Sequence, residues 1–551
     1  MRLSLLFLTA ILAGQMWGQG QKHASKCNIE FQKHEQKLKK ETSISKDDWD
    51  ETTYEKQNKR ICTLGEESFG ETIKRTNEEF EAFLDSINED YAQYLKKEWK
   101  TISFRSMHQL QKDKEEEPVF EKEQKYENLV LKGEIVDVKT DSYSHPQPPY
   151  NIRENDETNI SNTFYFYGTT MEARWGDANK FKFSSTSINK QELSDAYKFF
   201  SDKKFKNLLF DCLEIRDKYD LCDWAYYKML QAMTETIFGK GTNESLFLQG
   251  VLLGQSGYSM RFAIDNLTNH LYLLCKINEE VSNFPTFSDK DDGTVYYLFE
   301  KDLKTNDLDF CPKSYKGEQE MSLKIPALPK LDNKLTDEKV IYDRNNTIRL
   351  SYQINQNLIN FFDDYPIHYR DSDLFTRWVN YANSPVSKEI RNYVYPKLWN
   401  KIKDYIPDHI DHAADIILSW ICPIHIDEFK KEPEDGQIGI RYIDDNIFPG
   451  YDRTFFPDET LKYTGGDCED HAILFSRIIR DLLELDVVLV YFPNHLATAV
   501  RFDKDVKGSC VDVDGVKYTI CDPTCYRGKV GRTYSKYAML DKKDIKIIPL
   551  N

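Results

Sequence analysis

Apolar residues recur every three or four positions in the early part of the chain. Between Thr76 and Trp99 a stripe of aromatic and aliphatic side chains has this spacing, which predicts an amphipathic helix. We therefore expect residues 22–105 to be helical and highly charged. Residues 106–158 lose the pattern. They are acidic, rich in lysine and dotted with proline, which predicts a linker.

Two globular blocks follow. In residues 159–324 a strand-like segment is followed by helical periodicity and then by further strands. A proline-containing break at residues 325–345 predicts a second linker, and residues 346–551 form the second block. The mixed patterns in both blocks predict an α+β fold, in which a helix packs on an antiparallel sheet.

The second block has its clearest pattern near the end of the chain. An apolar helix over His471–Leu483 is followed by the strand Val487–Phe492, and a second strand begins at His495. The turn Asp514-Gly515 is typical of a β-hairpin, whose returning strand leads to Asp522.

The first twenty residues have the pattern of an export signal. Arg2 precedes an almost unbroken apolar stretch, Leu3–Gly14, which suits a signal peptide and is too short to span a bilayer. Gly18-Gln19-Gly20 offers small residues for cleavage, so we expect residues 1–20 to be removed and the mature chain to be secreted or periplasmic. An uncleaved membrane anchor is the alternative. After signal cleavage we expect no integral membrane span.

The composition narrows the possible partners. The 551 residues include 91 acidic and 74 basic side chains, and the formal net charge of -17 repels phosphate backbones, which argues against nucleic-acid binding. The 11 cysteines are an odd number, so at least one thiol stays unpaired in an exported protein, and an unpaired thiol can be reactive.

One cysteine has the sequence setting of a nucleophile. Asp467 is a good N-cap, so Cys468 lies on the first turn of the helix, where unpaired amides and the helix dipole favour a thiolate. His495 starts a strand, and Asp522 ends the strand after the hairpin. In a Cys-His-Asp set the imidazole takes the thiol proton and the carboxylate orients the ring. We therefore expect Cys468, His495 and Asp522 to be catalytic.

The residues around this set form recognisable motifs. Gly465–Asp470 reads Gly-Gly-Asp-Cys-Glu-Asp, the Pro-x-Glu-Thr-Leu segment Pro457–Leu461 precedes it, and Asp522–Thr524 reads Asp-Pro-Thr. These motifs resemble the transglutaminase-like (papain-like) cysteine enzyme superfamily, in its microbial exported branch, over roughly residues 400–535. The resemblance implies this fold for the second block. Leu496 departs from the aromatic residue that often follows the catalytic histidine of the family, which concerns substrate preference.

The first block repeats features of the second. Asn243 stands where the second block has its cysteine, and His270 follows after 27 residues, the same spacing as in the second block. Glu300 lies near the position of the catalytic carboxylate. Because an amide cannot act as this nucleophile, we expect the first block to be a degenerate transglutaminase-like repeat. The two blocks are thus predicted to be tandem domains.

The second block also has a segment that the first lacks. Residues 432–466 have no counterpart before Asn243 and run directly into the nucleophile. Such a segment beside a site is a candidate wall or lid for a substrate. Among its aromatic residues, we expect Tyr451 or Tyr463 to line a groove beside Cys468.

Metal binding is the weaker interpretation of the same residues. Cys468 and His471 have C-x-x-H spacing, and Cys521 with Cys525 could complete a zinc site. The helix start gives Cys468 a different role, however, and exported cysteine pairs more often form disulfides. We therefore expect no metal and no cofactor.

Together these features predict an exported enzyme that transfers acyl groups through a thiol and acts on amide bonds of a peptide or protein substrate. With water as the acceptor it is a peptidase or amidase, which we favour because water is always present. With an amine as the acceptor it is a protein-crosslinking transglutaminase. The alternative class is a non-catalytic envelope binding or scaffold protein with transglutaminase-like folds.

Overall fold

The computed structural model combines helices with antiparallel sheets, so the predicted α+β class is confirmed. Residues 82–95 form a helix, and Leu84–Asn551 form one compact unit. Within the described part of the chain, no helix is both long and apolar enough to cross a membrane. The predicted signal peptide, most of the predicted N-terminal helical region and Tyr451 lie outside the described residues. The structure describes residues 82–97, 99–107, 128–136, 138, 143–148, 161–184, 188–300, 303, 306–313, 315, 317–367, 374–422, 433–443, 453–525 and 527–550.

The first block is built on a closed barrel. Its strands are β1 (Lys100–Met107), β6 (Met260–Ile264), β7 (Leu271–Cys275), β8 (Pro285–Ser288), β9 (Val295–Leu298) and β10 (Asp307–Phe310), in the order β1-β10-β6-β7-β9-β8. Beside the barrel are the hairpin β4 (Asn162–Phe166) and β5 (Thr169–Ala173) and the helices α4 (Lys190–Phe200), α5 (Lys206–Lys218), α6 (Asp223–Phe238) and α7 (Asn243–Gln255). Helix α7 packs against β6 and β7, and α6 packs against α7.

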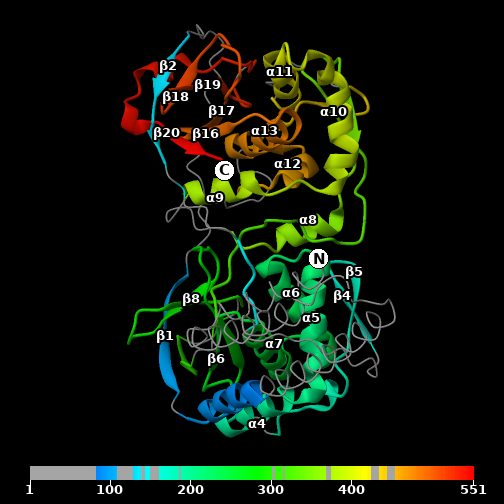
Figure 1. The fold of residues 1–551 in the computed structure, drawn as a ribbon, viewed down its shortest axis with the longest axis vertical. Coiled ribbons are helices and arrows are strands. Elements are labelled where there is room, and N and C mark those ends of the chain that lie inside the picture. The colour runs from blue at the N-terminus through cyan, green and yellow to red at the C-terminus, as the bar shows by residue number, and fades with distance from the viewer. Residues whose placement is uncertain are drawn as a thin grey trace, which may run out of the picture. The chain divides into compact units, whose positions relative to one another are not determined.

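The second block is built on a seven-stranded sheet. Its strands are β2 (Val130–Lys132), β3 (Glu134–Ile135), β16 (Val487–Phe492), β17 (His495–Val500), β18 (Cys510–Val513), β19 (Val516–Cys521) and β20 (Lys546–Pro549), in the order β2-β18-β19-β17-β16-β20-β3. Helix α13 (Cys468–Leu483) lies against β16 and β17 (Figure 1). Strands β16 and β17 are almost entirely buried, because α13 packs against them and their other side chains join a cluster with Leu131 and Tyr537.

Further helices and short strands surround α13. Helices α9, α11 and α12 pack on α13, and α10 packs on α11. The bounds are α8 (Gln356–Asp363), α9 (Leu374–Asn383), α10 (Tyr395–Ile402), α11 (Ile410–Ile421), α12 (Pro457–Tyr463), β11 (Lys339–Tyr342), β12 (Arg349–Tyr352), β13 (Gln437–Ile438), β14 (Arg441–Tyr442) and β15 (Gly465–Gly466). Strand β11 lies within residues 325–345, which the sequence predicted to be a linker.

In the first block, strand register determines where Glu300 lies relative to His270. Leu274 on β7 pairs with Leu298 on β9. Leu274 is four residues after His270, and Glu300 is two residues after Leu298. The end of β9 therefore brings Glu300 back beside the start of β7.

In the second block, the same register relates Asp522 to His495. Ala499 on β17 pairs with Ile520 on β19. Ala499 is again four residues after the histidine, and Asp522 is again two residues after the paired partner. The two carboxylates thus occupy matching positions, and the three extra residues of the first block lie in the connections between its strands.

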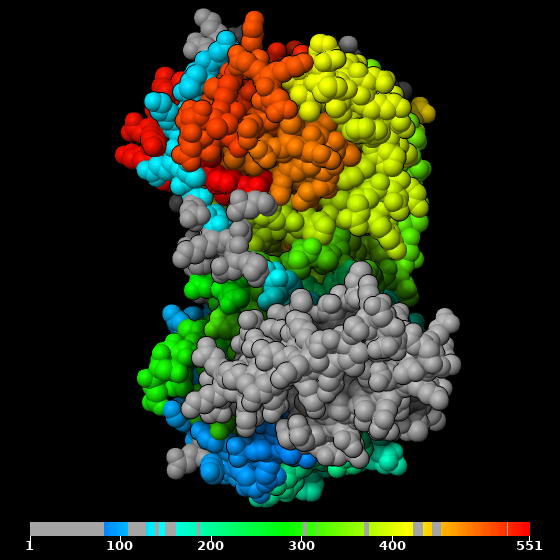
Figure 2. Space-filling model, in the orientation of Figure 1, coloured from blue at the N-terminus to red at the C-terminus, as the bar shows by residue number. Residues whose placement is uncertain are grey.

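A segment between β1 and the remaining strands of the first block completes the sheet of the second block. Strand β2 pairs in parallel with β18, and β3 pairs in parallel with β20, so residues 130–135 connect the two edges of the sheet. In Figure 2 the cyan atoms of this segment lie beside the orange and red atoms of the C-terminal sheet. Residues 106–158, predicted to be a linker, therefore contribute two strands to the second block.

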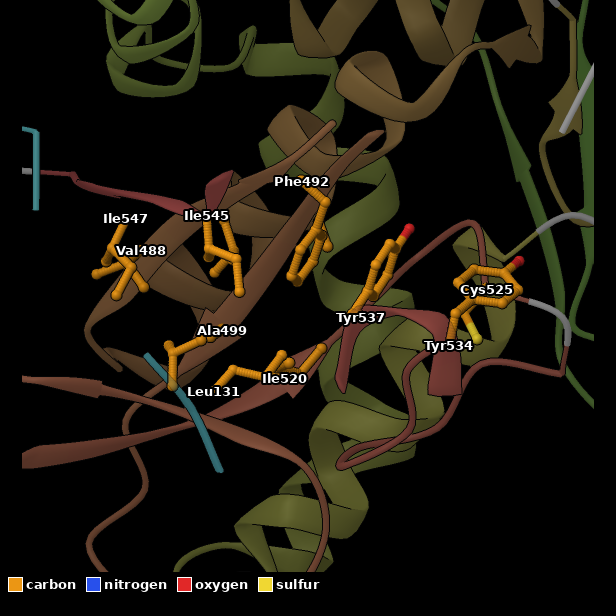
Figure 3. Packing of buried hydrophobic residues seen from close by; sticks show 13 residues of the cluster. Leu131, Val488, Phe492, Ala499, Ile520, Cys525, Tyr534, Tyr537, Ile545 and Ile547 are labelled. Atoms are coloured by element: carbon orange, nitrogen blue, oxygen red, sulfur yellow. The ribbon is translucent and has the colours of Figure 1, made fainter. Parts of the chain in front are cut away.

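The segment also contributes to the interior of the sheet. Leu131 is buried in a cluster with Val488, Ala499, Ile520 and other apolar residues of the second block (Figure 3). In the first block Ile102 on β1 is buried in the corresponding barrel interior. Both sheets thus bury an aliphatic residue of an early strand, although β1 runs antiparallel to its neighbours and β2 and β3 run parallel to theirs.

Candidate active site

A capping box fixes the start of α13 and therefore the position of Cys468. The Asp467 side chain accepts a hydrogen bond from the Asp470 backbone N–H at 3.3 Å, and the Asp470 carboxylate accepts one from the Asp467 N–H at 3.3 Å. A Cβ on Gly466 would collide with the Asp470 carboxylate, so this position needs glycine. Cys468 is thus held on the first turn of the helix, as the sequence predicted.

His495 and Asp522 are hydrogen-bonded to each other. The distance between His495 Nε2 and Asp522 Oδ2 is 2.9 Å. Asp522 is fully buried, and its second oxygen accepts hydrogen bonds from the backbone N–H groups of Thr524 at 3.0 Å and Cys525 at 3.1 Å. The turn after β19 therefore holds the carboxylate in place, which accounts for the Asp-Pro-Thr sequence.

This hydrogen bond assigns different roles to the two ring nitrogens. Because an ionised Asp522 can only accept, His495 Nε2 carries the hydrogen in the neutral imidazole. His495 Nδ1 is then the nitrogen with a lone pair, and it is the atom that can take a proton from a thiol.

A backbone hydrogen bond connects the thiol to the histidine strand. The N–H of Leu496 donates to Cys468 Sγ at 3.4 Å. Since Leu496 follows His495 directly, this contact places the sulfur beside the start of β17. The structure thus brings the start of α13, the start of β17 and the end of β19 together, and each carries one of the three predicted residues.

The thiol itself is in a less activating environment than the sequence predicted. Cys468 is 8 % exposed, and burial raises the pKa of its thiol well above the usual range. The charges of Glu469 and Asp467 raise this pKa further, whereas the Leu496 N–H lowers it. The helix-start argument predicted a thiolate at neutral pH, and it did not include the burial of the sulfur or the adjacent carboxylates.

Aromatic rings surround the histidine. The rings of Phe492 and Tyr537 stack face to face, with centroids 3.9 Å apart, and the ring of Tyr534 packs edge-on against Tyr537 (Figure 3). The imidazole of His495 lies 6.1 Å from the Tyr537 ring at an interplanar angle of 17°. These rings limit how far the imidazole can turn. Tyr534 and Tyr537 lie on a 3₁₀ turn after β19, and sequence reasoning gave no signal for them.

The extra segment of the second block lies directly before Cys468. Only residues 239–242 separate α6 from α7, whereas β13, β14, α12 and β15 lie between α11 and α13. The N–H of Phe455 donates to the Asp470 carboxylate at 2.6 Å, which attaches this segment to the first turn of α13.

The structure places one of the two predicted groove residues. Tyr463, on α12, packs its ring 5.2 Å from that of Phe455 and donates its hydroxyl to Asp363 at the end of α8 at 3.2 Å. Its polar end is therefore engaged with α8. Tyr451 lies outside the described residues, so a groove beside Cys468 stays a prediction.

The possible zinc ligands have other partners. His471 is buried, its Nδ1 lies 2.6 Å from the carbonyl oxygen of Asp467, and its Nε2 lies 3.2 Å from that of Ile440. Burial lowers its pKa. Among the described residues, no group of three or more histidine, cysteine or acidic side chains could hold a metal ion. The nine cysteines in that part of the chain are buried, and none of them is in a disulfide.

The first block contains a matching arrangement without a thiol. Asn243 starts α7, and its side chain accepts a hydrogen bond from the N–H of Leu271 at 2.9 Å and donates one to the carbonyl oxygen of Asn269 at 3.0 Å. His270 Nε2 lies 3.4 Å from Glu300 Oε2. Asn243 therefore connects the helix to the backbone on both sides of His270.

Comparison with protein families, with curated proteins and with solved structures finds no match to this chain. The resemblance to transglutaminase-like enzymes therefore depends on the motifs and on the arrangement of residues described above.

Proposed function

We propose that this chain is an exported thiol enzyme of the transglutaminase-like type that hydrolyses amide bonds in peptides or proteins. The observation that carries the proposal is the 2.9 Å hydrogen bond between His495 and the buried Asp522, on strands that adjoin the sulfur of Cys468. A buried carboxylate that orients an imidazole next to a thiol is the arrangement that nucleophilic catalysis by cysteine requires.

The first half of the proposed reaction forms a thioester. Cys468 Sγ attacks the carbonyl carbon of the amide, and the thiol proton passes to His495 Nδ1. A backbone amide at the start of α13 stabilises the negative oxygen of the tetrahedral intermediate. The C–N bond then breaks, the imidazolium gives its proton to the departing amine, and the acyl group remains on the sulfur.

The second half releases the acid. His495 takes a proton from a water molecule, whose oxygen attacks the thioester carbon. The C–S bond breaks, and the sulfur recovers a proton from the imidazolium. Asp522 keeps Nδ1 directed at the reacting atoms and stabilises the positive ring in both halves. An amine in place of water would give a crosslinking transglutaminase by the same steps.

The first block supports a second candidate function. Its helix start, histidine and carboxylate match those of the second block, but Asn243 stands at the position of Cys468, which favours a purpose other than catalysis for this block. In this alternative the whole chain is a binding or scaffold protein of the cell envelope.

The reactivity of Cys468 separates the two functions. The purified chain, Cys468→Ser and His495→Ala are each treated with iodoacetamide at pH 7, and the adducts are mapped by mass spectrometry. The same proteins are incubated with fluorescent casein, to detect hydrolysis, and with dimethylcasein plus a dansylated amine, to detect transamidation. We expect an adduct on Cys468 that forms more slowly in His495→Ala, and casein hydrolysis that Cys468→Ser abolishes.

The opposite result is equally clear. Equal labelling of Cys468 in the wild type and His495→Ala, together with no hydrolysis and no amine incorporation, contradicts the enzyme and favours the binding protein. If amine incorporation exceeds hydrolysis, the protein is a transglutaminase and not a peptidase.

A further inference from the structure

The thiol of Cys468 donates its hydrogen bond to a carboxylate that the proposed reaction does not use. Cys468 Sγ lies 3.2 Å from Oε2 of Glu469, the next residue of α13. The imidazole of His495 is engaged with Asp522 instead. In this structure the nucleophile and the base therefore each have a carboxylate of their own.

The second oxygen of Glu469 faces a buried cation. Glu469 Oε1 lies 3.9 Å from Nη2 of Arg377 on α9, and the two side chains are 10 % and 2 % exposed. The positive charge of a guanidinium favours the anionic form of a carboxyl group beside it. Glu469 thus accepts a hydrogen bond from the thiol with one oxygen and faces Arg377 with the other.

We propose that Glu469 is a positioning residue whose hydrogen bond holds Cys468 as a protonated thiol and so slows the reactions of the sulfur. This inference rests on the proposed function, since it describes the control of the same nucleophile. The proton of the thiol passes from Sγ to His495 Nδ1 only after the hydrogen bond to Glu469 is broken. The acyl transfer that follows is unchanged.

The charges around the thiol determine the direction of the effect. An anion next to a thiol disfavours the thiolate, so Glu469 raises the pKa of Cys468. Removing that charge while keeping the shape of the side chain lowers the pKa. The other charged or titratable groups around the thiol come from several elements. They are Asp467 at the N-cap of α13, Asp470 and His471 on α13, Arg377 on α9, His495 on β17, Asp522 after β19 and Tyr537 on the following 3₁₀ turn.

The test is the pH dependence of alkylation. The rate of Cys468 modification by iodoacetamide is measured from pH 5 to pH 10 in the full chain, in Glu469→Gln and in Glu469→Asp. Glu484→Gln, on an exposed residue that follows the same helix, is the matched control. Circular dichroism confirms that each variant is folded.

We expect the midpoint of the curve to move to lower pH in Glu469→Gln, and the rate at pH 7 to rise about tenfold for every pH unit by which the midpoint falls. Glu469→Asp keeps the charge beside Arg377 but is one methylene shorter, so its contact with the sulfur is lost and its curve should move in the same direction by less. Glu484→Gln should coincide with the wild type. If Glu469→Gln does not fold, the midpoint of the Glu469→Asp curve tests the proposal instead.

Two outcomes overturn the inference. One is a Glu469→Gln or Glu469→Asp curve that coincides with that of the wild type, and the other is a midpoint that moves to higher pH. Failure of the proposed function looks different, because it requires that His495→Ala leaves the labelling unchanged and that no substrate is turned over. If the curve of Glu469→Gln moves to lower pH but no substrate is turned over, the role of Glu469 is supported and the proposed enzymatic function is contradicted.

Discussion

Asn243 and Cys468 occupy the same position in two copies of one arrangement. Each is the first residue of its helix, and each accepts a hydrogen bond from the backbone N–H that follows a histidine. That distance is 2.9 Å from Leu271 N to Asn243 Oδ1 and 3.4 Å from Leu496 N to Cys468 Sγ. The Asn243 amide makes a second backbone hydrogen bond as well, to the Asn269 carbonyl, so it connects the helix to the strand at the position matching Cys468.

This relationship predicts a structural role for Asn243. Asn243→Ala removes two hydrogen bonds and leaves the Leu271 N–H and the Asn269 carbonyl without these partners, which should lower the free energy of unfolding by about 1–3 kcal/mol. Urea denaturation measures the change. Labelling of Cys468 is the internal control and should stay at the wild-type rate. A variant as stable as the wild type would show that the two hydrogen bonds contribute little.

Asp522 should control the reactivity of Cys468 through His495. Asp522→Asn keeps the size of the side chain but removes the charge that orients Nε2 and stabilises the imidazolium. We expect alkylation of Cys468 at pH 7 and turnover of any substrate to fall by at least about 10²-fold. Kinetics with Asp486→Asn, an exposed carboxylate in the turn before β16, should match the wild type. Unchanged kinetics in Asp522→Asn would assign this carboxylate to folding alone.

The path of the chain from β2 to β3, along β20, depends on Gly133. A Cβ at this position would lie 2.9 Å from side-chain atoms of Ile545 and Ile547 and 3.0 Å from the Ile545 carbonyl oxygen. Gly133→Ala should therefore destabilise the chain by about 1–3 kcal/mol, as overpacking does. Thermal unfolding is the measurement. Gly254→Ala in α7 is the control, because its Cβ would meet only Met260 at an ordinary 3.8 Å, and it should leave stability unchanged or raise it.

Asp458 should make stability depend on pH. It is buried on α12, its Oδ2 accepts the Ser387 N–H at 3.1 Å, and its Oδ1 has no hydrogen-bond partner. Burial raises its pKa to about 7. The folded chain therefore keeps a proton that the unfolded chain releases near pH 4, and the free energy of unfolding should fall as pH rises from about 4 to about 7.

Urea denaturation between pH 4 and pH 8 checks this dependence. In Asp458→Asn the decline should become shallower, because an amide does not titrate and can still accept the Ser387 N–H. A decline of equal size in both proteins would assign the pH dependence to other groups.

The sequence predicted local features of this chain better than distant ones. The N-cap at Asp467, the helix start at Cys468 and the strand start at His495 are encoded by neighbouring residues, and the structure shows each of them. The hairpin turn at Asp514-Gly515 likewise brings Asp522 to the end of β19. The catalytic role of these residues stays a prediction.

Contacts between distant segments were not predictable in the same way. No local pattern relates Arg377 to Glu469, because a single buried arginine on an amphipathic helix gives no sign of its partner. The state of the thiol was missed for a related reason. The sequence shows a helix dipole at Cys468, but the burial of the sulfur depends on the strands and helices that pack around it. Residues 106–158 have the composition of a linker, and only the finished sheet shows that two short strands lie within them.

The strands β2 and β3 also constrain the order in which the sheet of the second block can form. They are synthesised before the other five strands of that sheet. Lys546, on β20, contacts Glu134, on β3, across 412 residues of sequence. The sheet around His495 and Asp522 therefore cannot be completed until β20 has been made. Contacts between residues so far apart in the sequence form slowly. A chain without β20 has an unpaired strand edge at β16, so the strand that is made long after β2 and β3 is needed for the assembled site.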